Sequence, residues 1–131
     1  MEHIRGKLGM SLLRESRATF RSPDGKVRVV CAVSKEFSKR GGRQGYWFSF
    51  HPHQKEGLEK TGKPYVAYGC GSGKKTVLIP YKEFAKWLEG LNKTEMTDRF
   101  YWHVHIYDDG GKLTLKCKAG FEDIDITQYL V

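Results

Sequence analysis

Residues 19–33 read TFRSPDGKVRVVCAV, and this stretch decides the centre of the fold. Its middle, Ser22-Pro23-Asp24-Gly25, is a β-turn signal, because proline suits the second position of a turn and glycine the fourth. The turn predicts a hairpin between a short strand at residues 19–21 and a longer strand at residues 27–33. The longer strand is apolar on most positions of both faces, which is typical of a strand with neighbours on either side.

On the N-terminal side of this hairpin, the sequence predicts a helix over residues 3–16. Ile4, Leu8 and Leu12 recur every four positions, which is the spacing of one helical face. Arg14 and Arg17 would lie away from that apolar face.

On the C-terminal side, a strand is expected at residues 46–51, where Pro52 ends it. Residues 53–63 are polar and predict a loop or a short helix. Two further hairpins are expected, one from residues 65–70 with 76–79, the other from residues 100–107 with 112–118.

The clearest helix signal begins at Pro80. Tyr81, Phe84, Leu88 and Leu91 form an apolar stripe, and Gly90 supplies a stop. One docked helical turn is expected in residues 124–130. The sequence therefore predicts a single α+β domain over residues 1–131, with one mixed β-sheet of five to seven strands and an N-terminal and a central helix packed on it.

Composition points to a soluble, basic protein. The chain has 131 residues and a net charge of +8. Its three cysteines are widely spaced and odd in number, which favours a reducing compartment. No apolar run is long enough to span a bilayer, and the N-terminus lacks the apolar run of a signal peptide. We therefore expect a cytoplasmic protein without a membrane partner.

The charge is divided unevenly along the chain. Residues 1–79 carry a net charge of +10 and residues 80–131 a net charge of −2. Such asymmetry is expected when one face of a protein meets a polyanion. The alternative is a solvated, lysine-rich surface.

Aromatic residues lie close to the basic segments, and aromatic rings flanked by positive charge grip unpaired bases. This combination predicts a nucleic-acid-binding domain, with DNA or RNA left open. The expected phosphate contacts are Arg14, Arg17, Lys35, Lys39, Arg40, Arg43, Lys74 and Lys75. The expected ring face comprises Tyr46, Tyr101, His103, His105 and Tyr107, while Trp47, Phe48 and Trp102 are assigned to the core.

Histidine pairs offer a second interpretation of the same strands. His103 and His105 are two residues apart, as are His51 and His53, and imidazole is a common ligand of zinc. We favour the polar side of an amphipathic strand for His103 and His105, and predict neither a metal site nor a cofactor. Residues 69–76 resemble a phosphate-binding loop but lack its glycine and hydroxyl spacing.

The order of elements resembles the PD-(D/E)XK nuclease-like superfamily over about residues 3–107. Pro23-Asp24 supplies the Pro-Asp, and Val77-Leu78-Ile79-Pro80 leads into a helix as in members of that group. The resemblance implies a metal-dependent nuclease using Asp24, Glu36 and Lys35, with Mg²⁺ or Mn²⁺ as cofactor. The expected catalytic strand contains no acid, so the resemblance favours a degraded active site and a module that only binds.

Three functions thus remain open from the sequence. The leading one is nucleic-acid binding without catalysis. The alternatives are the metal-dependent nuclease and a protein–protein interaction module without enzymatic activity.

Overall fold

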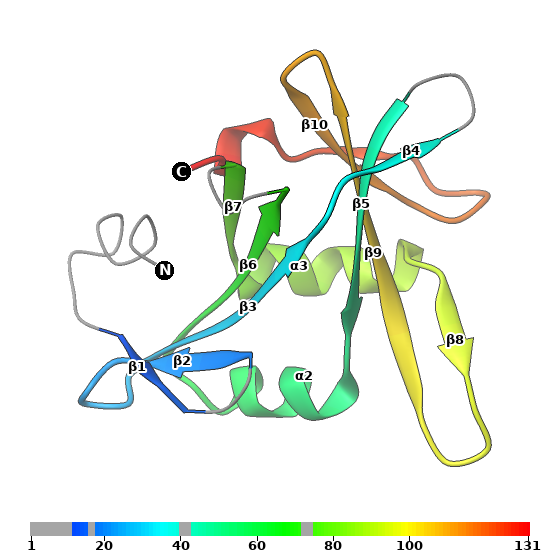
Figure 1. Cartoon of the computed structure of the whole chain (residues 1–131). Helices are drawn as coiled ribbons and strands as arrows, with labels where there is room; N and C mark the ends of the chain where they lie inside the picture. Colours follow the sequence, from blue (N-terminus) through cyan, green and yellow to red (C-terminus); the bar gives the residue numbers. More distant parts are fainter. Residues whose placement is uncertain (1–11, 16–17, 40–42, 72–74) are drawn as a thin grey trace.

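The computed structural model describes residues 12–15, 18–39, 43–71 and 75–131, with backbone alone at residues 37–39 and 43. In these residues the strands form two sheets, of five and six strands. The expectation of a single sheet was therefore wrong. Figure 1 shows the two sheets facing each other across the molecule, with α3 (Tyr81–Trp87) running between them.

The first sheet, sheet A, is built around the hairpin that the sequence predicted. Its order is β1 (Leu13–Arg14), β2 (Thr19–Arg21), β3 (Val27–Ser34), β6 (Lys63–Cys70) and β7 (Lys75–Pro80). The turn between β2 and β3 closes with a 2.9 Å hydrogen bond from the Gly25 amide to the Ser22 carbonyl. As predicted, β3 is central, and it pairs in parallel with β6.

The second sheet, sheet B, has β9 (Phe100–Asp109) at its centre. Its order is β11 (Ile124–Asp125), β10 (Lys112–Lys116), β9, β5 (Arg43–Phe50) and β4 (Phe37–Lys39), and β8 (Lys93–Glu95) pairs with β9 as well. Only residues 35 and 36 separate β3 from β4. The chain therefore passes from one sheet into the other almost without interruption, which is visible in Figure 1.

The main core fills the space between the sheets. Phe84 on α3 contacts both of them, with ring centroids 6.0 Å from Tyr68 on β6 and 5.0 Å from Phe50 on β5. A backbone bridge between Val77 and Leu130 brings the C-terminal segment to β7. A second apolar cluster, which includes Val27, Val29 and Leu78, lies on the other face of sheet A.

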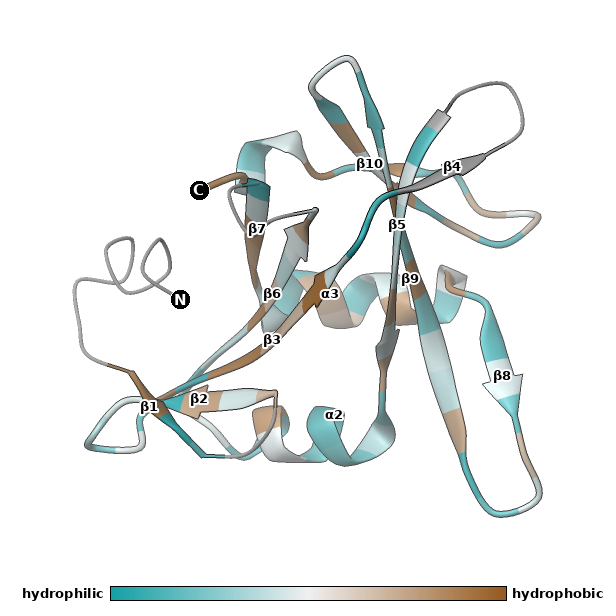
Figure 2. Cartoon of the chain, in the orientation of Figure 1, coloured by the Kyte–Doolittle hydropathy of each residue, from teal (hydrophilic) through white to brown (hydrophobic). Residues whose placement is uncertain are grey.

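The helices agree with the sequence patterns in part. The helix expected after Pro80 is α3, extended by η1 (Leu88–Gly90), and the polar segment after Pro52 is α2 (Pro52–Glu59). Figure 2 shows α2 as mainly hydrophilic, and Leu58 is its buried residue. The tail forms η2 (Thr127–Tyr129).

The N-terminal helix expected over residues 3–16 was wrong where the structure describes it. Leu13 and Arg14 are extended in β1 and pair with Arg21 and Phe20. Residues 1–11 and 16–17 lie outside the described residues. Gly6 and Gly9 weaken the expected helix. The backbone hydrogen bonds that β1 makes with β2 are therefore the more stable alternative for Leu13 and Arg14.

No helix in the described part of the chain is both long and apolar enough to cross a lipid bilayer.

Candidate functional site

The outer face of sheet B carries rings that point away from the core. Along β9, Trp102, Val104 and Ile106 are buried between the sheets, while Tyr101 and His103 alternate with them and stay half-buried on the opposite face. This alternation follows from the two-residue period of a strand. It confirms the sequence-based assignment of residues 101–106 to an inner and an outer side.

Trp47 joins this face from the neighbouring strand β5, and the sequence-based assignment of Trp47 to the core was wrong. Its side chain is 38% exposed, whereas Phe48 is only 3% exposed. The indole lies 5.6 Å from the His103 ring, 6.3 Å from the Tyr101 ring and 6.4 Å from the His105 ring, in edge-to-face geometry. Trp47 therefore sits at the middle of a connected group of rings.

The group continues towards α2. Tyr101 stacks on His103 with centroids 5.4 Å apart and planes 19° apart. His51 lies 5.5 Å from Tyr101, and His53 stacks on His51 at 5.4 Å. We call this set the ring row; its members are His105, Trp47, His103, Tyr101, His51 and His53.

Hydrogen bonds fix the orientation of His103 within the ring row. The Trp47 indole Nε1–H donates to His103 Nδ1 over 3.2 Å. An indole nitrogen can only donate, so Nδ1 of His103 must accept, and in the neutral imidazole the proton then lies on Nε2. That Nε2 contacts the Thr94 hydroxyl on β8. The ring is thus held from both sides by β5 and β8.

His51 is held by the start of α2. Its backbone amide donates to the Gln54 side-chain oxygen over 3.0 Å, and its ring Nε2 contacts the Ser49 hydroxyl at 3.1 Å. Burial lowers the pKa of the His51 imidazole, and nearby His53 and Arg99 lower it further. A neutral imidazole at this position presents a ring face rather than a charge.

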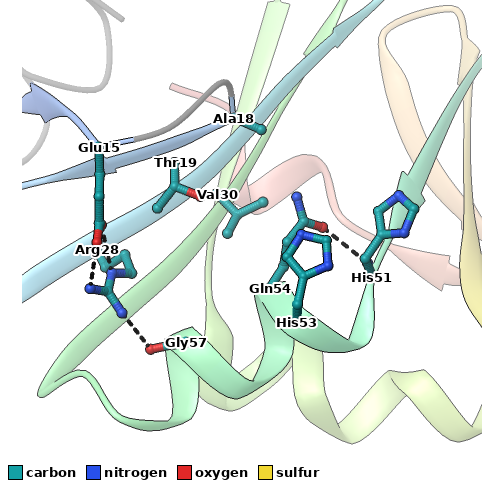
Figure 3. A pocket seen from close by; sticks show the side chains of 9 residues that line it. All are labelled: Glu15, Ala18, Thr19, Arg28, Val30, His51, His53, Gln54 and Gly57. Carbon is teal, nitrogen blue, oxygen red and sulfur yellow. Dashed lines mark hydrogen bonds and ion pairs between the residues drawn. The ribbon is translucent and has the colours of Figure 1, made fainter. Parts of the chain in front are cut away.

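Two clefts adjoin the His51–His53 end of the ring row. The smaller, about 450 Å³, is lined by residues that include Asp98, Arg99 and Phe100. The larger, about 680 Å³, lies between α2 and the β2–β3 hairpin (Figure 3). His51 and His53 line both clefts.

The predicted phosphate-binding residues divide into two groups. Lys35 is exposed between β3 and β4. The backbone of Lys39 pairs with that of Arg43 at the turn end of the β4–β5 hairpin, and Arg43 begins the strand that carries Trp47. Arg14 lies on β1 of the other sheet, and Lys75 forms an ion pair with Asp108. Within the described residues, Lys35, Lys39 and Arg43 therefore lie at or next to β4 and the start of β5, the strand that also carries Trp47, whereas Arg14 and Lys75 lie elsewhere. Arg17, Arg40 and Lys74 lie outside the described residues.

Two of the predicted stacking residues are not accessible. Tyr46 is 4% exposed and Tyr107 is 3% exposed. Tyr46 belongs to the inner face of β5 and packs in the main core. Neither ring can receive a base, and the predictions for Tyr46 and Tyr107 are corrected accordingly.

The residues of the nuclease alternative do not meet. Asp24 lies in the turn before β3, where its carboxylate accepts hydrogen bonds from Ser22 Oγ at 2.6 Å and from the Lys26 amide at 3.0 Å. Those bonds lower the pKa of Asp24. Lys35 and Glu36 follow the other end of β3, and eight extended residues span about 25 Å. The described residues contain no group of three or more His, Cys, Asp or Glu side chains that could hold a metal ion.

Sequence reasoning missed Trp47, His51 and His53 as members of one surface. The signal was available in the parity of β5, since Tyr46, Phe48 and Phe50 alternate with Trp47 and Ser49. What the pattern could not provide was the choice of the buried side, because both sets contain aromatic residues.

No protein-family model, no curated protein and no solved structure matches the chain. Function is therefore inferred from the geometry of the ring row.

Proposed function

We propose that the protein binds an unpaired stretch of nucleic acid on the ring row, without catalysis. The observation that carries this proposal is the connected, partly exposed series of rings that runs from Trp47 and Tyr101 on the outer face of sheet B to His51 and His53 at the start of α2. Each base has a π-face, so a series of rings holds successive bases with little dependence on sequence.

The charge distribution supports the same proposal. The segment of residues 35–43 contains four Lys or Arg and one acidic residue, and it leads into β5, the strand that carries Trp47. Arg99 lines the smaller cleft at the other end. A strand lying on the rings would therefore meet positive charge at both of its ends, as phosphate neutralisation requires.

Exposed rings support unpaired over paired strands. In a duplex the base faces are covered by their neighbours, so rings on a flat sheet have access to them only where a strand is single. The three free cysteines, Cys31, Cys70 and Cys117, support a reducing compartment such as the cytoplasm.

The test is a binding screen with fluorescently labelled single- and double-stranded DNA and RNA at two salt concentrations, read by anisotropy. We expect the single strands to bind best and both affinities to fall as salt rises. Trp47→Ala and Tyr101→Ala should each lose about 1–3 kcal/mol, or about 5- to 150-fold in Kd.

The matched control is Phe121→Ala, an aromatic side chain of comparable exposure (45%) that lies outside the ring row. It should bind as the wild type does. Equal losses in all three variants, or no binding of any strand, would contradict the proposal.

A further inference from the structure

Strand β8 pairs with β9 next to the ring row, as Figure 1 shows. Two of its three residues, Lys93 and Glu95, are exposed, and the third, Thr94, is half-buried. Thr94 lies opposite Tyr101 in the register of the two strands. Residues that lie opposite each other in an antiparallel pair share one face of the sheet. Thr94 is therefore the residue of β8 that faces the ring row.

The Thr94 hydroxyl is the last member of a chain of hydrogen bonds that begins at an exposed indole. Trp47 Nε1–H donates to His103 Nδ1 over 3.2 Å, and His103 Nε2 contacts Thr94 Oγ1. Because Nδ1 accepts, the neutral imidazole carries its proton on Nε2, and Thr94 Oγ1 accepts that proton. Donation therefore runs in one direction, from Trp47 to His103 and from His103 to Thr94.

This direction makes the bond between Trp47 and His103 depend on Thr94. If the imidazole proton lay on Nδ1, a donor would face the indole donor and the bond would be lost. The partner of one ring nitrogen sets which nitrogen of a histidine carries the proton. An acceptor at Nε2 therefore favours the tautomer in which Nδ1 accepts from Trp47, and it also restrains rotation of the ring.

The backbone of Trp47 is held separately from its indole. The Trp47 amide donates to Ser34 Oγ, at the end of β3, over 3.2 Å. The side chain projects from this anchor and is 38% exposed. The hydrogen bond to His103 thus acts on the one part of Trp47 that a base would contact. A ring that is already fixed loses less entropy when a ligand binds.

We infer that Thr94 is a positioning residue for nucleic-acid binding. Its hydroxyl, acting through His103, holds the Trp47 indole in the orientation that receives a base. The effect of Thr94 on affinity rests on the proposed function, whereas its effect on the indole rests on the hydrogen-bond chain alone. Thr94 itself needs no contact with the bound strand.

The first test compares Thr94→Val, which keeps the shape of the side chain and removes the acceptor, with Thr94→Ser, which keeps a hydroxyl. In the valine variant we expect faster exchange of the Trp47 indole N–H with solvent and stronger acrylamide quenching of tryptophan fluorescence. The ¹⁵N NMR shifts of the His103 ring should show both tautomers. The serine variant should match the wild type in all three measurements.

The second test measures the affinity of the same variants for a labelled decathymidylate. Thr94→Val should bind about 2- to 10-fold more weakly than the wild type, the range of one hydrogen bond. Thr94→Ser should recover most of that loss. The matched control is Thr97→Val, an exposed threonine in the turn that follows β8. It should keep the wild-type affinity and quenching.

The decisive comparison is Thr94→Val in a Trp47→Ala background. Because Thr94 acts through Trp47, its replacement should cause no further loss of affinity once the indole is absent. A residue that only stabilises the sheet would cause the same 2- to 10-fold loss in both backgrounds, and that result would overturn the inference.

The remaining outcomes separate the inference from the proposed function. Unchanged exchange and quenching in Thr94→Val overturn the role of Thr94, whatever the affinity. A released indole with unchanged affinity overturns the role of Thr94 in binding and leaves the proposed function standing. No binding of any strand by the wild type overturns the proposed function and the role of Thr94 in binding together.

Discussion

The indole Nε1–H of Trp47 on β5 donates a 3.2 Å hydrogen bond to Nδ1 of His103 on β9. The bond joins the two strands that pair at the centre of sheet B, and it lies on the outer face of that sheet. It holds an exposed indole in one orientation, which lowers the entropy that a flexible side chain would lose on binding.

His103→Ala should release Trp47, because the acceptor of the indole N–H is removed. We expect stronger acrylamide quenching of tryptophan fluorescence and a loss of about 0.5–1.5 kcal/mol in the free energy of unfolding. His103→Asn places an oxygen close to the position of Nδ1, so acrylamide should quench its tryptophan fluorescence to the same extent as in the wild type. Identical quenching in the alanine variant and the wild type would show that the bond does not hold the indole.

The basic hairpin should set the salt dependence of nucleic-acid binding. Replacing Lys39, Arg40 and Arg43 with alanine removes up to three phosphate contacts in the segment that leads into β5, the strand that carries Trp47. For a single strand, we expect the slope of log affinity against log salt to become shallower by about 2. The same measurement on Arg14→Ala, on the other sheet, should leave the slope unchanged. An unchanged slope in the triple variant would remove the hairpin from the interface.

The Lys75–Asp108 ion pair joins the two sheets and should make stability depend on pH. The Asp108 side chain is 3% exposed, and it also accepts the Gly111 amide at 2.8 Å. The hydrogen bond from Lys75, followed by that from Gly111, lowers the pKa of Asp108. A carboxyl with a lowered pKa in the folded state adds stability above its unfolded pKa, and that stability is lost as pH falls below about 4.

Asp108→Asn should therefore cost about 1–3 kcal/mol near pH 7 and flatten the loss of stability below pH 4. Urea unfolding at pH 7 and at pH 3 measures both effects. Glu95→Gln, an exposed carboxylate on β8, serves as the control and should change neither. A variant as stable as the wild type at pH 7 would argue against a structural role for the pair.

The His51 imidazole should titrate below the ordinary histidine value of about 6.5. Burial is the largest cause of the lowered pKa, followed by His53 and then Arg99. His53→Ala and Arg99→Ala should each bring the pKa of His51 closer to the ordinary value, and His53→Ala should have the larger effect. NMR titration of the His51 ring protons measures both shifts. Since the unfolded chain binds this proton more readily, the His51 contribution to stability decreases as pH falls through about 6.5. A His51 pKa above 6.5 in the wild type would contradict the burial of this ring.

Local signals in the sequence were sufficient for much of the fold. The turn at residues 22–25, the helix after Pro80 and the hairpin between β9 and β10 depend on neighbouring residues, and the structure contains all three. The division into two sheets could not be read in this way. The two residues that link β3 to β4, Lys35 and Glu36, are neither glycine nor proline, so nothing in the sequence signals a change of sheet there. The parallel pairing of β3 with β6 joins segments that are far apart in the sequence.

The candidate site was predictable on β9 and not on β5. In residues 101–106 the outer positions are polar aromatics and the inner positions are apolar, so parity identifies each face. In residues 46–50 both faces carry aromatic side chains, and the packing of Tyr46 and Phe48 against the core leaves Trp47 outside. Only the position of sheet A decides which face of β5 is buried.

The most direct measurement of the central claim is photochemical cross-linking of a 5-iodouracil-substituted single strand, followed by peptide mass spectrometry. Cross-links to Trp47, Tyr101 or the ring-row histidines are the result that we expect. Cross-links confined to sheet A, or a yield that persists unchanged in Trp47→Ala and Tyr101→Ala together, would show that nucleic acid does not lie on this face.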